Sequence, residues 1–380
     1  MGGAGGIRTP DLLVANEALS QLSHSPTVRC ILAQCRRAMQ DPGPLDCRRR
    51  AALHCAMAHQ RISRRQAVAT LAATAAATAA TDAAPRDAGL PIIDAHQHLW
   101  DLGRVRLPWL PADGPLAGNH VLTDYRRDAA GLGIVGSVYM EVDAPRELHP
   151  IEAKYAIDLC KDPRTSLLGA VIGGRPDEPG FAAYLDQFAH EPTVKGLRRV
   201  LHSAETPRGA CLRDDFIRGI RELGKRRLVF DICIPAESLD HAAMLCELCP
   251  ETRFVLDHCG NPNVQAADLS AWKRGIDAVS RQPNAACKIS GIVTSARSHG
   301  WRVDDLAPIV KHCAAAFGPD RILWASDWPV CTLNASLRQW LAAALEIVSD
   351  WALSDRRKLF HDNAVRVYRL RPAKQGAPKP

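Results

Sequence analysis

Short runs rich in valine, isoleucine and leucine alternate with helix-length amphipathic segments through most of this chain, and this alternation narrows the possible folds. The runs cover residues 91–98, 134–142, 167–174, 194–201, 227–234, 253–260, 286–292 and 321–328. Helix candidates between them cover residues 124–132, 151–160, 214–223, 238–249, 269–280, 304–317 and 334–348. Eight such repeats within residues 91–370 close into a barrel more readily than they spread into an open sheet. We therefore predict an α/β fold, a (β/α)8 TIM barrel. The Gly-rich dinucleotide fingerprint is absent, so no nucleotide cofactor is expected.

The segments outside residues 91–370 do not share this alternation. Residues 1–56 are Gly-rich and then Arg-rich without a hydrophobic period, which predicts a non-native or disordered extension upstream of the true start codon. Residues 371–380 are predicted to be a disordered tail.

The stretch at residues 57–90 begins at Met57 and has paired arginines, Arg64 and Arg65, before a weakly apolar Ala/Thr-rich run. It resembles a twin-arginine signal peptide with its linker, which predicts export to the periplasm rather than a cytoplasmic protein. The alternative is a solvated helical face, since alanine favours helices. Sequencing the amino terminus of the exported protein tests the prediction, because an intact Arg64-Arg65 pair would contradict it.

Composition excludes several classes of protein. Of the 48 lysines and arginines and 41 acidic residues, 11 and 6 lie in residues 1–90, so the remainder carries a net charge of only +2 and offers no basic groove for nucleic acid. That remainder has no apolar run of about 18 residues, so no stable membrane span is expected.

The 13 cysteines show no regular spacing, and Cys246 and Cys249 lack a second ligand pair. Core packing is therefore favoured over a disulfide framework or structural zinc.

Polar side chains gather where the predicted strands end. His96 and His98 close the first run, His258 the sixth and Asp327 the eighth. Alternate residues of a strand point to the same face, so His96 and His98 should project together. Barrel enzymes carry their chemistry at the carboxyl ends of the strands, so one shared site is predicted. Three further polar residues at or near strand ends are Glu141, Arg198 and Lys288. Trp100, Trp109 and Trp301 either cover the barrel mouth or cap the core.

Four motifs together resemble the amidohydrolase superfamily, and more narrowly its lactone-hydrolysing branch. They are Asp94-Ala95-His96-Gln97-His98, Asp257-His258-Cys259-Gly260-Asn261-Pro262, Lys288-Ile289-Ser290-Gly291 and Ser326-Asp327-Trp328-Pro329. The branch includes lactonases acting on fucono- and rhamnonolactones and on sulfomuconolactone and pyrone-dicarboxylate. The resemblance covers roughly residues 91–370 and implies a hydrolase that opens a sugar-acid or muconate-type lactone.

The resemblance also implies roles for individual residues. His96, His98, His258 and Asp327 would form the reaction centre, with Asp327 as general base and His258 stabilising the developing oxyanion. Two cofactor states remain open. His96, His98 and Asp327 can hold one divalent metal ion, zinc or manganese, or the imidazoles can donate hydrogen bonds to the carbonyl without metal. The fifth strand lacks the histidine of two-metal members, which disfavours a second ion.

Substrate contacts are less specific. Arg198 and Lys288 are predicted to bind a carboxylate or hydroxyls of a small-molecule lactone or carboxylate substrate, with solvated surface positions as the alternative. Glu141 is predicted either to accept a substrate hydroxyl or to form a salt bridge at the rim. The sequence does not indicate an oligomeric state.

Two rival functions remain open. A metal-dependent decarboxylase of an aromatic or muconate acid shares the barrel and the first-strand histidines, although such enzymes use the strand-five histidine that is absent here. A non-catalytic sugar-acid binding barrel is the other. It predicts that Asp327→Asn retains ligand affinity and that the wild-type protein has no catalytic turnover.

Overall fold

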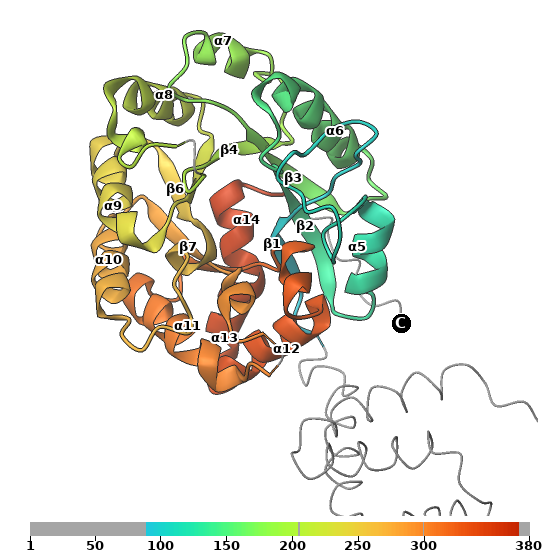
Figure 1. The fold of residues 1–380 in the computed structure, drawn as a ribbon, viewed down its shortest axis with the longest axis vertical. Coiled ribbons are helices and arrows are strands. Elements are labelled where there is room, and N and C mark those ends of the chain that lie inside the picture. The colour runs from blue at the N-terminus through green and yellow to red at the C-terminus, as the bar shows by residue number, and fades with distance from the viewer. Residues whose placement is uncertain (1–88, 204–205, 299, 372–380) are drawn as a thin grey trace, which may run out of the picture. The chain divides into compact units, whose positions relative to one another are not determined.

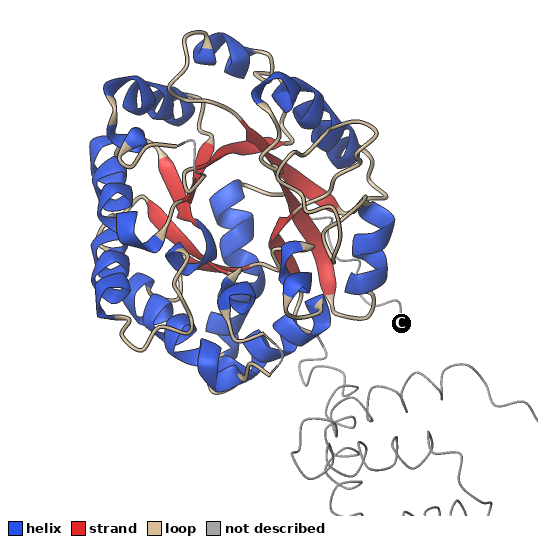
Figure 2. Cartoon of the chain, in the orientation of Figure 1, coloured by secondary structure: helices blue, strands red, loops and turns tan. Residues whose placement is uncertain are grey.

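The computed structural model describes residues 89–203, 206–298 and 300–371, and these residues form a ring of parallel strands surrounded by helices (Figures 1 and 2). The strands are β1 (Ile92–Gln97), β2 (Ile134–Met140), β3 (Leu167–Gly173), β4 (Val194–Val200), β5 (Val229–Cys233), β6 (Arg253–Leu256), β7 (Ala285–Ile289) and β8 (Ile322–Trp324). The helices are α5 (Leu122–Ala129), α6 (His149–Lys161), α7 (Phe181–Asp186), α8 (Asp214–Lys225), α9 (Leu239–Leu248), α10 (Ser270–Ser280), α11 (Val303–Phe317), α12 (Leu337–Ile347), α13 (Leu353–Arg357) and α14 (Asn363–Tyr368).

The sheet runs in chain order from β1 to β8, and every neighbouring pair is parallel. The ring is closed where β1 meets the segment that follows β8. There the amide of His98 donates to the carbonyl of Trp328 at 2.7 Å, and the amide of Asp327 donates to the carbonyl of His96 at 2.9 Å. The predicted (β/α)8 barrel is therefore confirmed, and its closure lies directly at the predicted site residues.

Two hydrophobic layers hold the barrel together. The larger lies between strands and surrounding helices, and the smaller fills the interior with side chains such as Ile93, Val171 and Leu323. Helix α14 lies in the middle of the ring in Figure 1, and its Tyr368 belongs to the interior layer. Because α14 closes one end of the interior, the opposite end, at the carboxyl termini of the strands, is where a substrate can enter.

All eight predicted strands are present, and several end earlier than predicted. The sixth stops at Leu256, because residues 257–260 turn away through a 3-10 segment with left-handed residues. The eighth stops at Trp324, so that Asp327 lies on the rim rather than in the strand. The seven predicted helices are present, whereas the short α7, α13 and α14 lie outside the predicted ranges. The predictions for residues 1–56, for residues 57–90 apart from the last two, and for residues 372–380 lie outside the described residues.

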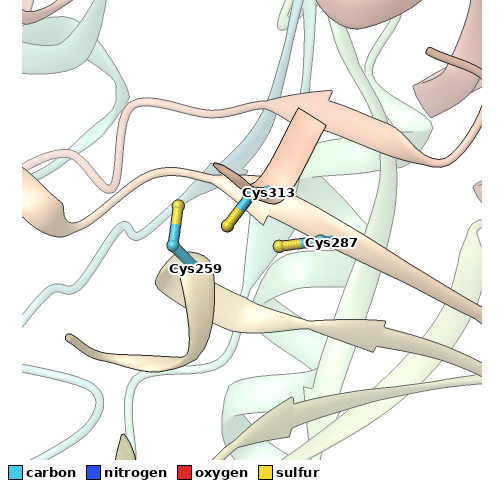
Figure 3. Close-up of side chains that lie close together, drawn as sticks. All are labelled: Cys259, Cys287 and Cys313. Atoms are coloured by element: carbon cyan, nitrogen blue, oxygen red, sulfur yellow. The ribbon is translucent and has the colours of Figure 1, made fainter. Parts of the chain in front are cut away.

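The predicted packing of cysteines in the core is confirmed for the described residues. Nine are present as free thiols, and eight of them are buried. Cys259, Cys287 and Cys313 lie close together between β7 and α11, inside the layer that separates barrel from helices (Figure 3). In the described part of the chain, no helix has the length and apolar character to cross a membrane.

Candidate active site

A cavity of about 440 Å³ opens at the carboxyl ends of the strands. Three residues of the predicted reaction centre, His98, His258 and Asp327, line it, and His96 lies fully buried directly behind His98. The wall also includes four apolar side chains, namely Trp109, Val142, Val200 and Val330. The structure thus brings together residues that are up to 231 positions apart in the sequence. It also places Trp109, one of the three tryptophans, at the mouth.

His96, His98 and Asp327 present three ligand atoms to one point. Nε2 of His96 and Nε2 of His98 are 3.1 Å apart, and they lie 3.5 Å and 3.3 Å from Oδ1 of Asp327. Ligands at about 2.1 Å around a tetrahedral zinc ion would be roughly 3.4 Å from one another. The three atoms therefore have the spacing of one face of a metal tetrahedron, and the cavity provides the open fourth position.

The remaining ring nitrogens of these histidines also have partners. Nδ1 of His98 lies 3.2 Å from the carbonyl oxygen of Met140, which can only accept, so we assign the proton to Nδ1 and a lone pair to Nε2. Nδ1 of His96 lies 3.1 Å from Nζ of Lys288 and 3.4 Å from Oδ1 of Asp257. Without metal, Nδ1 of His96 can accept a hydrogen bond from Lys288 while Nε2 of His96 donates to His98. With metal, Nδ1 can donate to Asp257 while Nε2 binds the ion. The site thus satisfies His96 in either cofactor state.

A second possible ligand group shares His96 with the first. It consists of His96, Asp257 and His258, all buried. Asp257 is less available to a metal ion, because its Oδ1 already lies 3.0 Å from the ammonium of Lys288 and its Oδ2 lies 3.7 Å from the Arg198 guanidinium. The group formed by His96, His98 and Asp327 has no such competing cation, so it fits a divalent ion better.

Two rim residues of the predicted reaction centre have unusual backbone conformations. Asp327 and His258 both lie in the left-handed region, at φ values of 58° and 53°. Such conformations are uncommon for residues other than glycine and concentrate at functional sites. Nδ1 of His258 lies 2.9 Å from Oγ of Ser290, which orients its Nε2 towards Asp327 at 3.9 Å. Burial alone would raise the pKa of Asp327, but His258 and His98 outweigh it and lower the pKa, so the carboxylate is ionised.

Asp94 ties the first and last strands together behind the site. Its Oδ1 accepts from the amide of Ser326 at 2.8 Å, and its Oδ2 accepts from the hydroxyls of Ser326 and Tyr125 at 2.5 Å and 2.9 Å. Burial raises the pKa of Asp94 to about 6, although these donors oppose the shift. Since Ser326 directly precedes Asp327, the hydrogen bonds between Asp94 and Ser326 fix the carboxylate of Asp327 relative to His96 and His98.

Lys288 does not line the cavity, which corrects its predicted role in substrate binding. Its side chain is fully buried, and the ammonium pairs with Asp231 on β5 and with Asp257 beyond β6. Tyr368 of α14 donates to Asp231 at 2.5 Å. The physical reason is that β7 points Lys288 into the barrel interior, where two buried carboxylates require a cation. Lys288 therefore supports His96 from behind.

Arg198 lines the cavity, but its charge is already paired with protein carboxylates. Nε donates to a carboxylate oxygen of Glu141, Nη2 donates to the carbonyl of Glu141 at 2.9 Å, and Nη1 lies 3.7 Å from Asp257. Glu141 is 2% exposed, so it is a buried partner of Arg198 and does not contact a ligand as a hydroxyl acceptor would. The salt-bridge alternative for Glu141 describes the structure, although the pair lies within the site and not at the rim.

A second buried glutamate, Glu152 on α6, lies beside this pair. Its Oε1 accepts from the amide of Val142 at 2.8 Å and from the hydroxyl of Tyr139 at 3.1 Å, while Oε2 has no hydrogen-bond partner. Burial first and Glu141 second raise the pKa of Glu152 to about 8. At neutral pH Glu152 therefore holds a proton that the unfolded chain has released.

This difference predicts a pH-dependent loss of stability. Between the ordinary pKa of 4.5 and the folded value of about 8 the folded state binds the extra proton. The free energy of unfolding should then fall by about 1.4 kcal/mol per pH unit from this group as pH rises. Glu152→Gln should remove that slope in urea unfolding measured from pH 5 to pH 8. The exposed Glu247→Gln on α9 is the matched control, and an unchanged slope in Glu152→Gln would contradict the shift.

Several cavity residues were not predicted as site residues. His202 follows β4, Asn261 follows the left-handed turn after His258, and Thr294 follows β7. Burial lowers the pKa of His202, so its imidazole is neutral and can donate and accept. The position of each residue just beyond a strand end was the available signal.

A model of the amidohydrolase family (Amidohydro_2) matches residues 93–370. An L-fucono-1,5-lactonase from Burkholderia multivorans is 28% identical over 294 residues, covering 73% of this chain and 96% of that protein. An L-rhamnono-gamma-lactonase from Scheffersomyces stipitis is 23% identical over 341 residues, covering 73% of this chain and 98% of its own length.

The fold is also shared with solved structures. Two crystal structures of an amidohydrolase from Burkholderia multivorans, one with bound HEPES and one with bound zinc, have TM-scores of 0.67 and 0.66. They are 25% and 24% identical to this chain, and each match covers 74% of this chain and 100% of the other.

Proposed function

This chain belongs to the amidohydrolase family, and from that membership we propose that it hydrolyses a lactone with the aid of one divalent metal ion. The observation that carries the proposal is the convergence of His96, His98 and Asp327 at the mouth of a cavity of about 440 Å³. A metal ion and a water molecule need such a set of ligands beside an open space. The similarity to two lactonases supports the choice of a cyclic ester as substrate.

The reaction needs a base for the attacking water and a proton for the departing ring oxygen. Asp327 is ionised and lies on the cavity wall, so it accepts the water proton as the new bond to the carbonyl carbon forms. When the ring carbon–oxygen bond breaks, the protonated carboxyl returns that proton to the leaving alkoxide. The product is the open hydroxy acid, and Asp327 is again a carboxylate.

His258 can donate a hydrogen bond to the carbonyl oxygen of the substrate. His258 is oriented by Ser290 towards the cavity, and His98 and Asp327 lie on the same wall. A zinc or manganese ion held by His96, His98 and Asp327 would polarise the carbonyl and acidify a bound water molecule. Donors fixed before the reaction need no reorganisation during it.

The cavity favours a lactone that carries no carboxylate. Among the lining residues, Arg198 is the one guanidinium or ammonium group, and it forms ion pairs with Glu141 and Asp257. Asp143 and Asp327 add negative charge to the same wall. Apart from the proposed metal ion, the cavity offers a substrate carboxylate no side-chain cation that is not already paired with a protein carboxylate, so a neutral lactone is favoured.

A substrate panel tests the proposal. Neutral sugar lactones and carboxylate-bearing muconate-type lactones would be compared by acid release in weak buffer. Neutral lactones should be hydrolysed with a kcat/KM at least about tenfold higher, the scale of one unfavourable charge contact. A chelator should abolish the activity, and zinc or manganese should restore it.

The outcomes separate the alternatives. Activity that survives chelation would select hydrogen-bonded histidines without metal. Release of carbon dioxide from aromatic or muconate acids, without lactone opening, would replace the proposal by the decarboxylase. Binding of lactones without turnover in the metal-loaded protein would leave only the binding barrel.

A further inference from the structure

A second cavity lies at the opposite end of the barrel, where the strands begin. Its volume is about 410 Å³, and five arginines line it: Arg227, Arg253, Arg321, Arg366 and Arg369. We refer to this cavity as the basal arginine pocket. Arg253 begins β6, Arg321 directly precedes β8, and Arg366 lies on α14. The residues that line this pocket are therefore separate from those that line the active-site cavity.

Three of the arginines are fixed by backbone carbonyls. Nη1 of Arg253 donates to the carbonyls of Arg366 and Val367 at 3.1 Å and 2.9 Å. Nη1 of Arg321 donates to the carbonyls of Gln282 and Ala285 at 3.0 Å and 3.1 Å. The guanidinium of Arg366 donates to the carbonyl of Asp320 and to Oδ1 of Asn363. These bonds hold the groups in place without neutralising their charge, and each guanidinium keeps further N–H donors.

The positive charge of the pocket has little compensation. Within the described part of the chain, none of the five arginines forms an ion pair. Glu251 is the one acidic residue among the lining side chains, and the nearby carboxylate of Asp320 pairs with Lys358 at 2.9 Å instead. Burial and then Arg366 and Arg227 lower the pKa of Arg253, and burial and then Arg253 and Arg227 lower that of Arg369. The guanidinium groups therefore lie close enough to repel one another electrostatically.

Arg227 and Arg369 are the two that remain free. In the described residues neither side chain has a hydrogen-bond partner, and both are exposed. Both also have left-handed backbone conformations, with φ values of 59° and 50°. Long side chains seldom adopt this region, and such strain is often found at binding positions.

We propose that the basal arginine pocket binds a soluble anion that carries at least two phosphate groups. Five guanidinium groups and one carboxylate leave four net positive charges on the lining side chains. Two phosphate groups carry about three to four negative charges at neutral pH, so a diphosphate matches the pocket better than a single phosphate. The planar guanidinium fork binds phosphate oxygens in pairs. The volume of the pocket is within the range of small-molecule sites.

Isothermal titration of the full chain with inorganic pyrophosphate tests this proposal. At about 150 mM salt, where exposed charges are screened, pyrophosphate should bind saturably and at least tenfold more tightly than orthophosphate. Arg227→Gln/Arg369→Gln should weaken the binding at least tenfold, because it removes the two free guanidinium groups. Arg218→Gln/Arg274→Gln, two exposed arginines on α8 and α10, is the charge-matched control and should change it less than twofold.

Lactone hydrolysis should be the same in all these variants, so the test is independent of the active site. Absence of saturable pyrophosphate binding up to roughly millimolar concentration would overturn the proposal. An equal loss in the control pair would also overturn it, since the binding would then depend on overall charge. Binding to vesicles of phosphatidylglycerol without binding of pyrophosphate would overturn it as well, in favour of a membrane headgroup.

Discussion

Replacing Asp327 by asparagine should lower kcat for lactone hydrolysis by about 10²- to 10⁴-fold, because the variant has no carboxylate to take the proton of the attacking water. Asparagine tolerates the left-handed conformation of Asp327, with φ at 58°, so the rim should keep its shape. Product affinity, measured by titration calorimetry, should change far less than kcat. This separation of binding from turnover is the signature of a group that acts in the chemical step.

The control for this experiment is Asp158→Asn on α6, an exposed aspartate whose loss should leave kcat unchanged. Wild-type kcat in Asp327→Asn would remove Asp327 from the mechanism. The melting temperature and metal content of each variant must be measured as well, since Asp327 is also a proposed metal ligand. If a metal-loaded, folded Asp327→Asn protein remains inactive, the loss can be assigned to the base.

Replacing Lys288 by methionine should destabilise the folded protein by about 3 to 5 kcal/mol, the usual effect of removing one partner from a buried ion pair. Lys288 is fully buried between Asp231 and Asp257, so its loss leaves two buried carboxylates without their cation. The deficit should be smaller at pH 5 than at pH 8. Without the ammonium, burial would raise the pKa of both aspartates, so each would cost stability as rising pH ionises it.

Urea unfolding of three variants checks this expectation. Lys288→Met should show the full loss, and Lys288→Met/Asp231→Leu should regain part of it, because one uncompensated carboxylate is removed with the cation. The exposed Lys311→Met on α11 should change the free energy of unfolding by less than about 0.5 kcal/mol. A Lys288→Met protein as stable as the wild type at pH 8 would contradict the role of Lys288 as the cation of the barrel interior.

The residues of the reaction centre could be identified from the sequence, whereas their geometry could not. His96, His98 and Asp327 each close an apolar run, and strand ends of a parallel barrel meet at one face. The distances of 3.1 to 3.5 Å between their ligand atoms could be learned only from the structure. They depend on the hydrogen bonds between Asp94 and Ser326 and on those that close the ring between β1 and the segment after β8.

The predicted substrate contacts show where sequence reasoning was insufficient. Lys288 and Arg198 were both predicted to bind the substrate, with solvated surface positions as the alternative, whereas the structure buries both charges. The partners that offset the cost of burial are Asp231, Asp257 and Glu141, which come from three other strands or strand ends. Nothing in the linear order shows that these charges meet, and so neither the engaged state of Arg198 nor the interior position of Lys288 could be predicted.

The order and type of the strands and helices were determined by local properties, because the period of the apolar residues and the polar residues after each run lie within a few positions of one another. The tertiary structure alone decided which charges are compensated. The free arginines of the basal arginine pocket and the engaged Arg198 have the same side chain, and they differ only in whether distant residues bring a carboxylate to them. Compensation of charge acts through space, and therefore it appears only when the chain is folded.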